Sequence, residues 1–176
     1  MIKIVSLCLL IYVLGFASSF MFDLNQNTYT TYQTQKIDTL FNDMQNKSSI
    51  DRFKKIASNN LFVICVNIIG ALSFGGITLL NTFYNGFIFG YIIKITMYLN
   101  DASIFHQRIT PHSFEIIAII LSSIIGLYYG NNIFFYLTDK KFKLANRQRL
   151  VNLYLIPICV FLTIFSAFIE AYVSMG

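Results

Sequence analysis

The chain has 176 residues, of which 56% are hydrophobic and only 12% are charged, and its mean hydropathy is +0.61. A soluble domain carries roughly 25% charged residues, so this composition excludes an ordinary soluble enzyme and predicts a polytopic membrane protein, with residues 1–176 as one domain. The net charge of +5 could suggest a nucleic-acid partner. The basic residues, however, concentrate in short loops between apolar runs, which indicates membrane topology and argues against nucleic-acid binding.

Five apolar segments predict an all-α membrane helix bundle of about five transmembrane helices. In chain order they cover residues 4–22, 61–80, 84–99, 113–137 and 150–173. The third is short, contains Lys94 and follows the second across only residues 81–83, so a re-entrant or kinked segment is an alternative. The first could instead be a cleaved signal peptide, because the small residues Ala17, Ser18 and Ser19 follow an apolar core.

The polar stretch between the first two segments, residues 23–60, predicts an external helical loop. Its apolar residues recur at helical spacing in two sets, Ile37, Leu40, Phe41 and Met44, then Ile50, Phe53 and Ile56. These sets predict amphipathic helices on the membrane surface, with Arg52, Lys54 and Lys55 toward water or headgroups. A small helical hairpin packed on the bundle fits the same pattern.

The basic loop at residues 139–149 sets the orientation. It holds five bases against one acid, so the positive-inside rule places it in the cytoplasm of a bacterial cell. Five spans then place the N-terminus, with Lys3, in the cytoplasm and the C-terminus outside. The same bases could dock a partner or anionic lipid, and they are Lys140, Lys141, Lys143, Arg147 and Arg149.

Small residues predict how the spans pack. They form the pairs Gly86 and Gly90, Gly126 and Gly130, and Ala167 and Ala171. Such small-xxx-small pairs let helix backbones approach closely in lipid, and one of these faces could also form a homodimer. Pro157 predicts a kink in the fifth segment. The three cysteines lie inside apolar runs and are interpreted as small core residues.

The ionisable residues of the apolar segments should share one membrane face. The fourth and fifth spans are antiparallel, so the start of one and the end of the other lie on the same side. The predicted polar cluster on the outer side comprises Asn60, Asn67, Lys94, His112, Glu115 and Glu170. Because a charge at the bilayer centre costs roughly 2.5–3.5 kcal/mol on insertion scales, these side chains should be paired or lie near an interface.

Three interpretations of this cluster remain open. His112 and Glu115 are spaced i, i+3 and with Glu170 could bind a metal, but the chain has no His-Glu-x-x-His pattern and no third strong ligand, so no metal or other cofactor is expected. A proton or cation relay is chemically feasible. In the third interpretation, charged hydrogen bonds tie helix ends together. No serine or cysteine accompanies a base and no ATPase motif is present, so a non-enzymatic protein is expected.

Several of these residues carry a resemblance to the stage II sporulation protein M family, over roughly residues 53–172. The matching elements are Asn59-Asn60, Gly70 with Gly75, Asn85-Gly86 with Gly90, Pro111-His112-x-Phe114-Glu115-x-x-Ala118 followed by Gly126 and Gly130, and Phe168-Ile169-Glu170-Ala171. The Pro-His-x-x-Glu element together with the late Ile-Glu-Ala is the more specific part. One departure is Ser113, where the family usually has glycine.

The resemblance implies a multi-pass membrane protein. Short family members accompany circular bacteriocin gene clusters, where they are implicated in maturation, export or immunity beside an ATPase. The sporulation member resembles a scaffold for a cell-wall-degrading complex. The expected partners are therefore membrane lipids, other membrane subunits and a cytoplasmic ATPase. A composition rich in Ile, Asn, Lys and Tyr favours the bacteriocin-type role.

Overall fold

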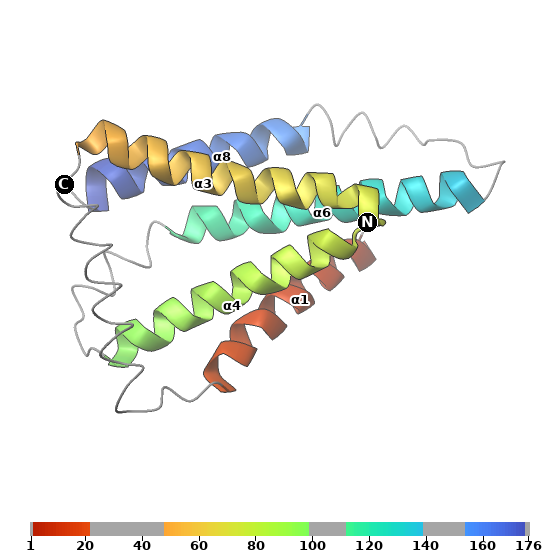
Figure 1. The fold of residues 1–176 in the computed structure, drawn as a ribbon, viewed down its shortest axis with the longest axis horizontal. Coiled ribbons are helices and arrows are strands. Elements are labelled where there is room, and N and C mark those ends of the chain that lie inside the picture. Colours follow the sequence, from red (N-terminus) through yellow and green to blue (C-terminus); the bar gives the residue numbers. More distant parts are fainter. Residues whose placement is uncertain (1, 22–47, 99–111, 139–153, 175–176) are drawn as a thin grey trace.

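A computed structural model describes residues 2–21, 48–98, 112–138 and 154–174 (Figure 1). In these ranges the chain forms helices α1 (Ile2–Met21), α3 (Ser49–Ile69), α4 (Gly76–Tyr98), α6 (His112–Thr138) and α8 (Ile156–Ile169). A 3-10 turn, η1 (Gly70–Ser73), extends α3, and a π-helical turn, η3 (Glu170–Ser174), extends α8. The described residues thus hold five helical stretches that are long and apolar enough to cross a membrane, which confirms the predicted all-α class.

The five helices run back and forth through the molecule (Figure 1). The ends of α1, α4 and α8 and the starts of α3 and α6 all lie at one end, which we call the far end because the N-terminus lies at the other. Helices α3, α6 and α8 pack on one another, and α1 packs along α4. The pair α1 and α4 approaches the other three helices near the N-terminus and diverges from them toward the far end (Figure 1).

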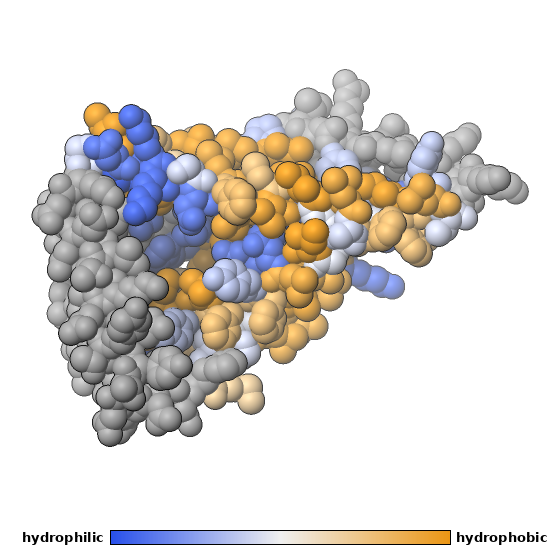
Figure 2. Space-filling view, viewed as in Figure 1, coloured by the Kyte–Doolittle hydropathy of each residue, from blue (hydrophilic) through white to orange (hydrophobic). Residues whose placement is uncertain are grey.

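The surface of the described helices separates by polarity. Figure 2 shows hydrophilic side chains gathered at the far end, where α3 begins, while the helices beyond are mostly hydrophobic on this face. Asp51, Lys54 and Lys55 are exposed in this first part of α3. Soluble monomers rarely expose such broad apolar surface, so the outer faces of the bundle suit contact with lipid tails.

The turn between the second and third spans differs from the prediction. Residues 81–83 were expected to form it, but they lie inside α4, and the turn falls at Phe74 and Gly75. Both residues have left-handed backbone, with φ of 57° at Phe74 and 92° at Gly75, and glycine adopts such a φ without steric cost. As a result Gly76–Met97 is a full 22-residue apolar helix rather than a short third segment.

The second span also begins earlier than predicted. Helix α3 starts at Ser49, and the Ser48 hydroxyl caps it by accepting a hydrogen bond from the Asp51 N–H at 3.2 Å. The second apolar set of the expected external loop, Ile50 to Ile56, is therefore the first part of the span. The side chains of Ile56 and Ala57 pack against α8 rather than lying on the membrane surface. The first set, residues 37–44, lies outside the described residues.

Small residues lie where helix backbones approach each other. A Cβ at Gly86 would collide with the backbone of Tyr12, and a Cβ at Gly90 with the Ser19 hydroxyl and the Phe16 carbonyl, so both glycines face α1. Gly126 and Gly130 of α6 face the end of α3 and the Phe74–Gly75 turn in the same way. Ala167 and Ala171 are fully buried against α3. Each predicted pair thus lies at a helix interface within the chain.

Pro157, where a kink was predicted, lies near the start of the described part of the fifth span. It lies in the first turn of α8, directly after a π-helical turn at residues 154–155. Proline is tolerated there because its missing N–H would have no helical partner.

Candidate functional site

The first turn of α6 supplies two ionisable side chains that contact each other. His112 Nδ1 lies 2.7 Å from Glu115 Oε2, and the two side chains are 22% and 17% exposed. The i, i+3 spacing puts both on one side of the helix. The carboxylate also lies near the positive end of the α6 dipole, which stabilises its negative charge.

Glu170 joins this pair from the end of the last helix. His112, Glu115 and Glu170 each have one nitrogen or oxygen atom that lies within 4.8 Å of those of the other two. Glu170 begins the π-helical turn η3, and π-helical turns occur frequently at functional sites. Ala167 and Ala171, on either side of it in sequence, are fully buried against Ile56 and Ala57 of α3. This packing fixes the end of α8 next to the start of α6.

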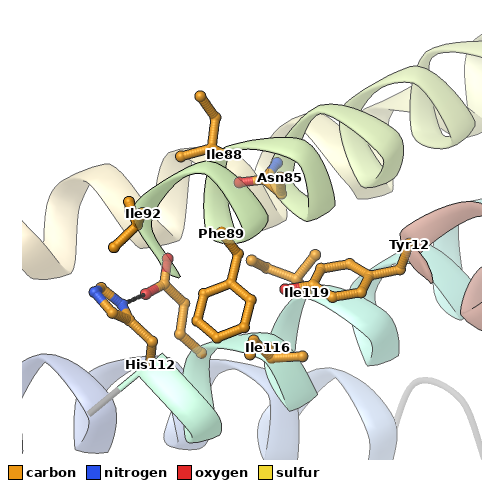
Figure 3. A pocket seen from close by; sticks show the side chains of 9 residues that line it. Tyr12, Asn85, Ile88, Phe89, Ile92, His112, Ile116 and Ile119 are labelled. Carbon is orange, nitrogen blue, oxygen red and sulfur yellow. Dashed lines mark hydrogen bonds and ion pairs between the residues drawn. The ribbon is translucent and has the colours of Figure 1, made fainter. Parts of the chain in front are cut away.

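A cavity of about 60 Å³ borders the His112–Glu115 pair, between α1, α4 and α6 (Figure 3). Its polar lining comes from Tyr12, Asn85, His112 and Glu115, and its apolar lining from Ile88, Phe89, Ile92, Ile116 and Ile119. Figure 3 shows Tyr12 reaching from α1 toward the space between α4 and α6. The Tyr12 hydroxyl is buried and finds no hydrogen-bond partner among the described residues. The cavity is therefore polar at several points and apolar between them.

Lys94 lies in the last turns of α4, whereas Asn60, predicted for the same cluster, lies at the middle of α3. Lys94 Nζ donates to the Phe20 carbonyl at 3.4 Å, which joins the ends of α4 and α1. Asn60 is buried in α3, and its Oδ1 accepts a hydrogen bond from Asn59 Nδ2 at 3.3 Å. The Asn60 amide nitrogen has no partner in the described part of the chain.

Asn67 does not join the cluster, contrary to the prediction. Because α3 begins at Ser49, Asn67 lies near the opposite end of the helix, about 27 Å along its axis at 1.5 Å per residue. Its amide nitrogen donates to the Ile119 carbonyl at 3.3 Å and to the hydroxyls of Ser122 at 2.8 Å and Ser123 at 3.1 Å. It is thus a hydrogen-bonding centre between α3 and α6, fully buried from solvent.

A row of asparagines connects this centre with the cavity. Asn81 Nδ2 donates to Asn67 Oδ1 at 2.8 Å, and Asn85 Nδ2 donates to the Asn81 carbonyl at 2.7 Å. Asn85 in turn lines the cavity beside Glu115. The roles of Tyr12, Asn81 and Asn85 were not predicted. The i, i+4 spacing of Asn81 and Asn85 was the signal that could have shown one polar stripe on an apolar helix.

The arrangement can hold a cation, bind a polar group of a ligand, or tie the helix ends together.

The five basic residues of the 139–149 loop lie outside the described residues. Exposed Cys65 and buried Cys8 and Cys159 have no described role beyond packing, and Cys159 Sγ contacts the Ala118 carbonyl at 3.1 Å.

Comparison with known proteins identifies relatives of the chain. The family model described as "Stage II sporulation protein M" matches residues 4–175. An uncharacterized protein of Methanocaldococcus jannaschii is 34% identical over 125 residues, which cover 69% of this chain and 70% of that protein. No solved structure matches the chain.

Proposed function

Because the chain belongs to the stage II sporulation protein M family, we propose that it is a non-enzymatic, multi-pass subunit of a cell-membrane complex. In this proposal the complex matures or exports a bacteriocin-type peptide, or gives immunity to it. The observation that carries the proposal is the cavity with four polar lining residues between the start of α6 and the middle of α1 and α4. These two helix groups diverge toward the far end (Figure 1).

Polar side chains inside a membrane span cost free energy, so they are rare there unless they serve a function. In the described helices, Tyr12, Asn85, His112 and Glu115 meet around one cavity although the segments that carry them are apolar enough to span a membrane. Ionisable groups in membrane spans typically serve binding or transport. The cavity itself is too small for a peptide, but the surrounding far end offers hydrogen-bonding groups to a polar segment of a peptide or of a neighbouring subunit.

Energy for export would come from a separate protein. With the N-terminus and the basic loop in the cytoplasm, the 139–149 loop and the Phe74–Gly75 turn face the side where an ATPase would bind. Five bases in the loop could contact an acidic surface on that ATPase or anionic lipid headgroups.

A triple variant distinguishes binding of an ATPase from contact with lipid headgroups. Lys140→Gln, Lys141→Gln and Lys143→Gln together should release a co-purifying cytoplasmic protein while the amount of chain in the membrane stays unchanged, because neutral residues weaken docking without adding opposite charge. The measurement is affinity purification from the native host followed by identification of bound proteins.

A matched control removes bases from the other membrane side. Lys54→Gln with Lys55→Gln changes two exposed bases at the start of α3 and should leave the cytoplasmic partner bound. Retention of every partner by the triple variant would contradict docking through the loop. Absence of any co-purifying protein in the wild type would contradict the subunit role itself.

A second candidate function is an ion- or proton-coupled conduit. It is favoured by the polar row from the cavity through Asn85 and Asn81 to Asn67, which extends toward the opposite membrane side. A scaffold for a cell-wall-remodelling complex is a variant of the subunit role, supported by the sporulation stage in the family's name. Co-purification of a wall hydrolase would favour the scaffold, and ion flux through vesicles holding only this chain would favour the conduit.

A further inference from the structure

The convergence of His112, Glu115 and Glu170 suits a metal ion better than an ion pair alone. We propose that these three side chains bind one divalent first-row transition-metal ion, such as Zn²⁺ or Mn²⁺, at the far end of the bundle. The site is formed wholly by this chain, so the inference goes beyond the proposed function and does not depend on any partner.

The ligand chemistry and the spacing both fit. An imidazole and two carboxylates suit first-row divalent ions, and three protein ligands with an open position are common in zinc sites. Ligands bound to one such ion lie about 3 to 4 Å from each other, given metal–ligand distances of about 2.0–2.2 Å. The three candidate atoms already lie within 4.8 Å of one another, so small side-chain rotations would close the site.

The net charge of the three side chains also favours a metal ion. With both carboxylates ionised, two negative charges face one imidazole, so even a protonated His112 leaves one negative charge without a counter-charge among the three. All three side chains are only partly exposed, and an uncompensated charge in such surroundings is costly. A divalent ion with a neutral imidazole would bring the set to zero net charge.

An independent observation comes from the neighbouring cavity. Tyr12 is only 7% exposed, and its hydroxyl has no hydrogen-bond partner in the described ranges although it lines the same cavity as His112 and Glu115. A buried hydroxyl without a partner is unfavourable. The cavity volume of about 60 Å³ is large enough to hold water. A water that completes the coordination of the ion could accept a hydrogen bond from the Tyr12 hydroxyl or donate one to its oxygen.

The test is a titration of the full-length protein in detergent after treatment with a chelator. Isothermal calorimetry with Zn²⁺ and with Mn²⁺ should show saturable binding of one ion per chain for at least one of them. His112→Asn, Glu115→Gln and Glu170→Gln should each weaken that binding at least about tenfold. Tyr12→Phe should weaken it less than loss of a ligand does, because it removes only a contact to bound water.

Two controls remove other metal-binding groups. Asp51→Asn deletes an exposed carboxylate on α3, and Cys65→Ser deletes the exposed thiol; neither should change the affinity. Helix content measured by circular dichroism shows which variants fold. If a ligand variant does not fold, the proposal is judged from the titration of the wild-type protein. Failure of both ions to bind saturably, or equal affinity in folded ligand variants, would overturn the proposal. If Tyr12→Phe binds the ion as tightly as the wild type, the proposed hydrogen bond between Tyr12 and metal-bound water is wrong.

Discussion

The Asn67→Leu variant is expected to unfold at a clearly lower temperature than the wild-type protein in detergent. The Asn67 amide is fully buried and joins α3 to α6 through Ser122, Ser123 and the Ile119 carbonyl, and to α4 through Asn81. Interhelical hydrogen bonds in membrane proteins average about 0.6 kcal/mol each. Loss of four such contacts, with the donors and acceptors left behind in an apolar interior, should cost about 2 to 3 kcal/mol.

The matched control is Asn59→Leu on the same helix. Asn59 is exposed at the middle of α3, so its replacement makes the same chemical change and removes only the hydrogen bond to its neighbour Asn60, leaving the buried centre intact. Thermal unfolding followed by circular dichroism should show a large decrease for position 67 and little change for position 59. Equal decreases at the two positions would mean that Asn67 does not hold the helices together.

The second large effect is expected for Gly126→Ala. A Cβ at position 126 would collide with the backbone carbonyl of Asn67 and would lie 2.6 Å from the Thr78 hydroxyl oxygen. A backbone cannot rotate away as a side chain can, so α6 would have to move from α3. Overpacking of this kind costs about 1–3 kcal/mol, and the unfolding temperature should fall accordingly.

Gly76→Ala provides the comparison for this prediction. A Cβ there would meet the Ser73 hydroxyl oxygen at 3.6 Å, an ordinary contact. Since alanine favours a helix by up to about 1 kcal/mol over glycine, this variant should be as stable as the wild type or more so. A stable Gly126→Ala protein would contradict the close approach of α3 and α6.

The apolar segments were sufficient to predict the number of spans and their helical class. Residues 113–137 were predicted almost as the structure has them, at His112–Thr138, because polar sequence borders that run on both sides. The Phe74–Gly75 turn was missed because apolar residues continue through it. Hydropathy carries no information about the left-handed backbone that ends α3 and lets α4 begin.

The grouping of His112, Glu115 and Glu170 at one membrane face follows from topology alone, since α6 and α8 are antiparallel. Their mutual distances do not, because these depend on the π-helical turn and on the contact of Ala167 with α3. Asn67 was wrongly assigned to the same face through the error in the start of the second span. Tyr12 could not be predicted, because its place at the cavity depends on how closely the glycines let α1 approach α4.

The most direct test of the account is the side of the membrane on which each connection lies. Single cysteines at positions 35, 73, 143 and 176 of a cysteine-free protein can be labelled in intact cells with a reagent that does not cross the membrane. The five-span bundle with a cytoplasmic N-terminus predicts labelling of positions 35 and 176 from outside, and of positions 73 and 143 only after the membrane is opened. Labelling of positions 35 and 143 from the same side would contradict the five-span arrangement.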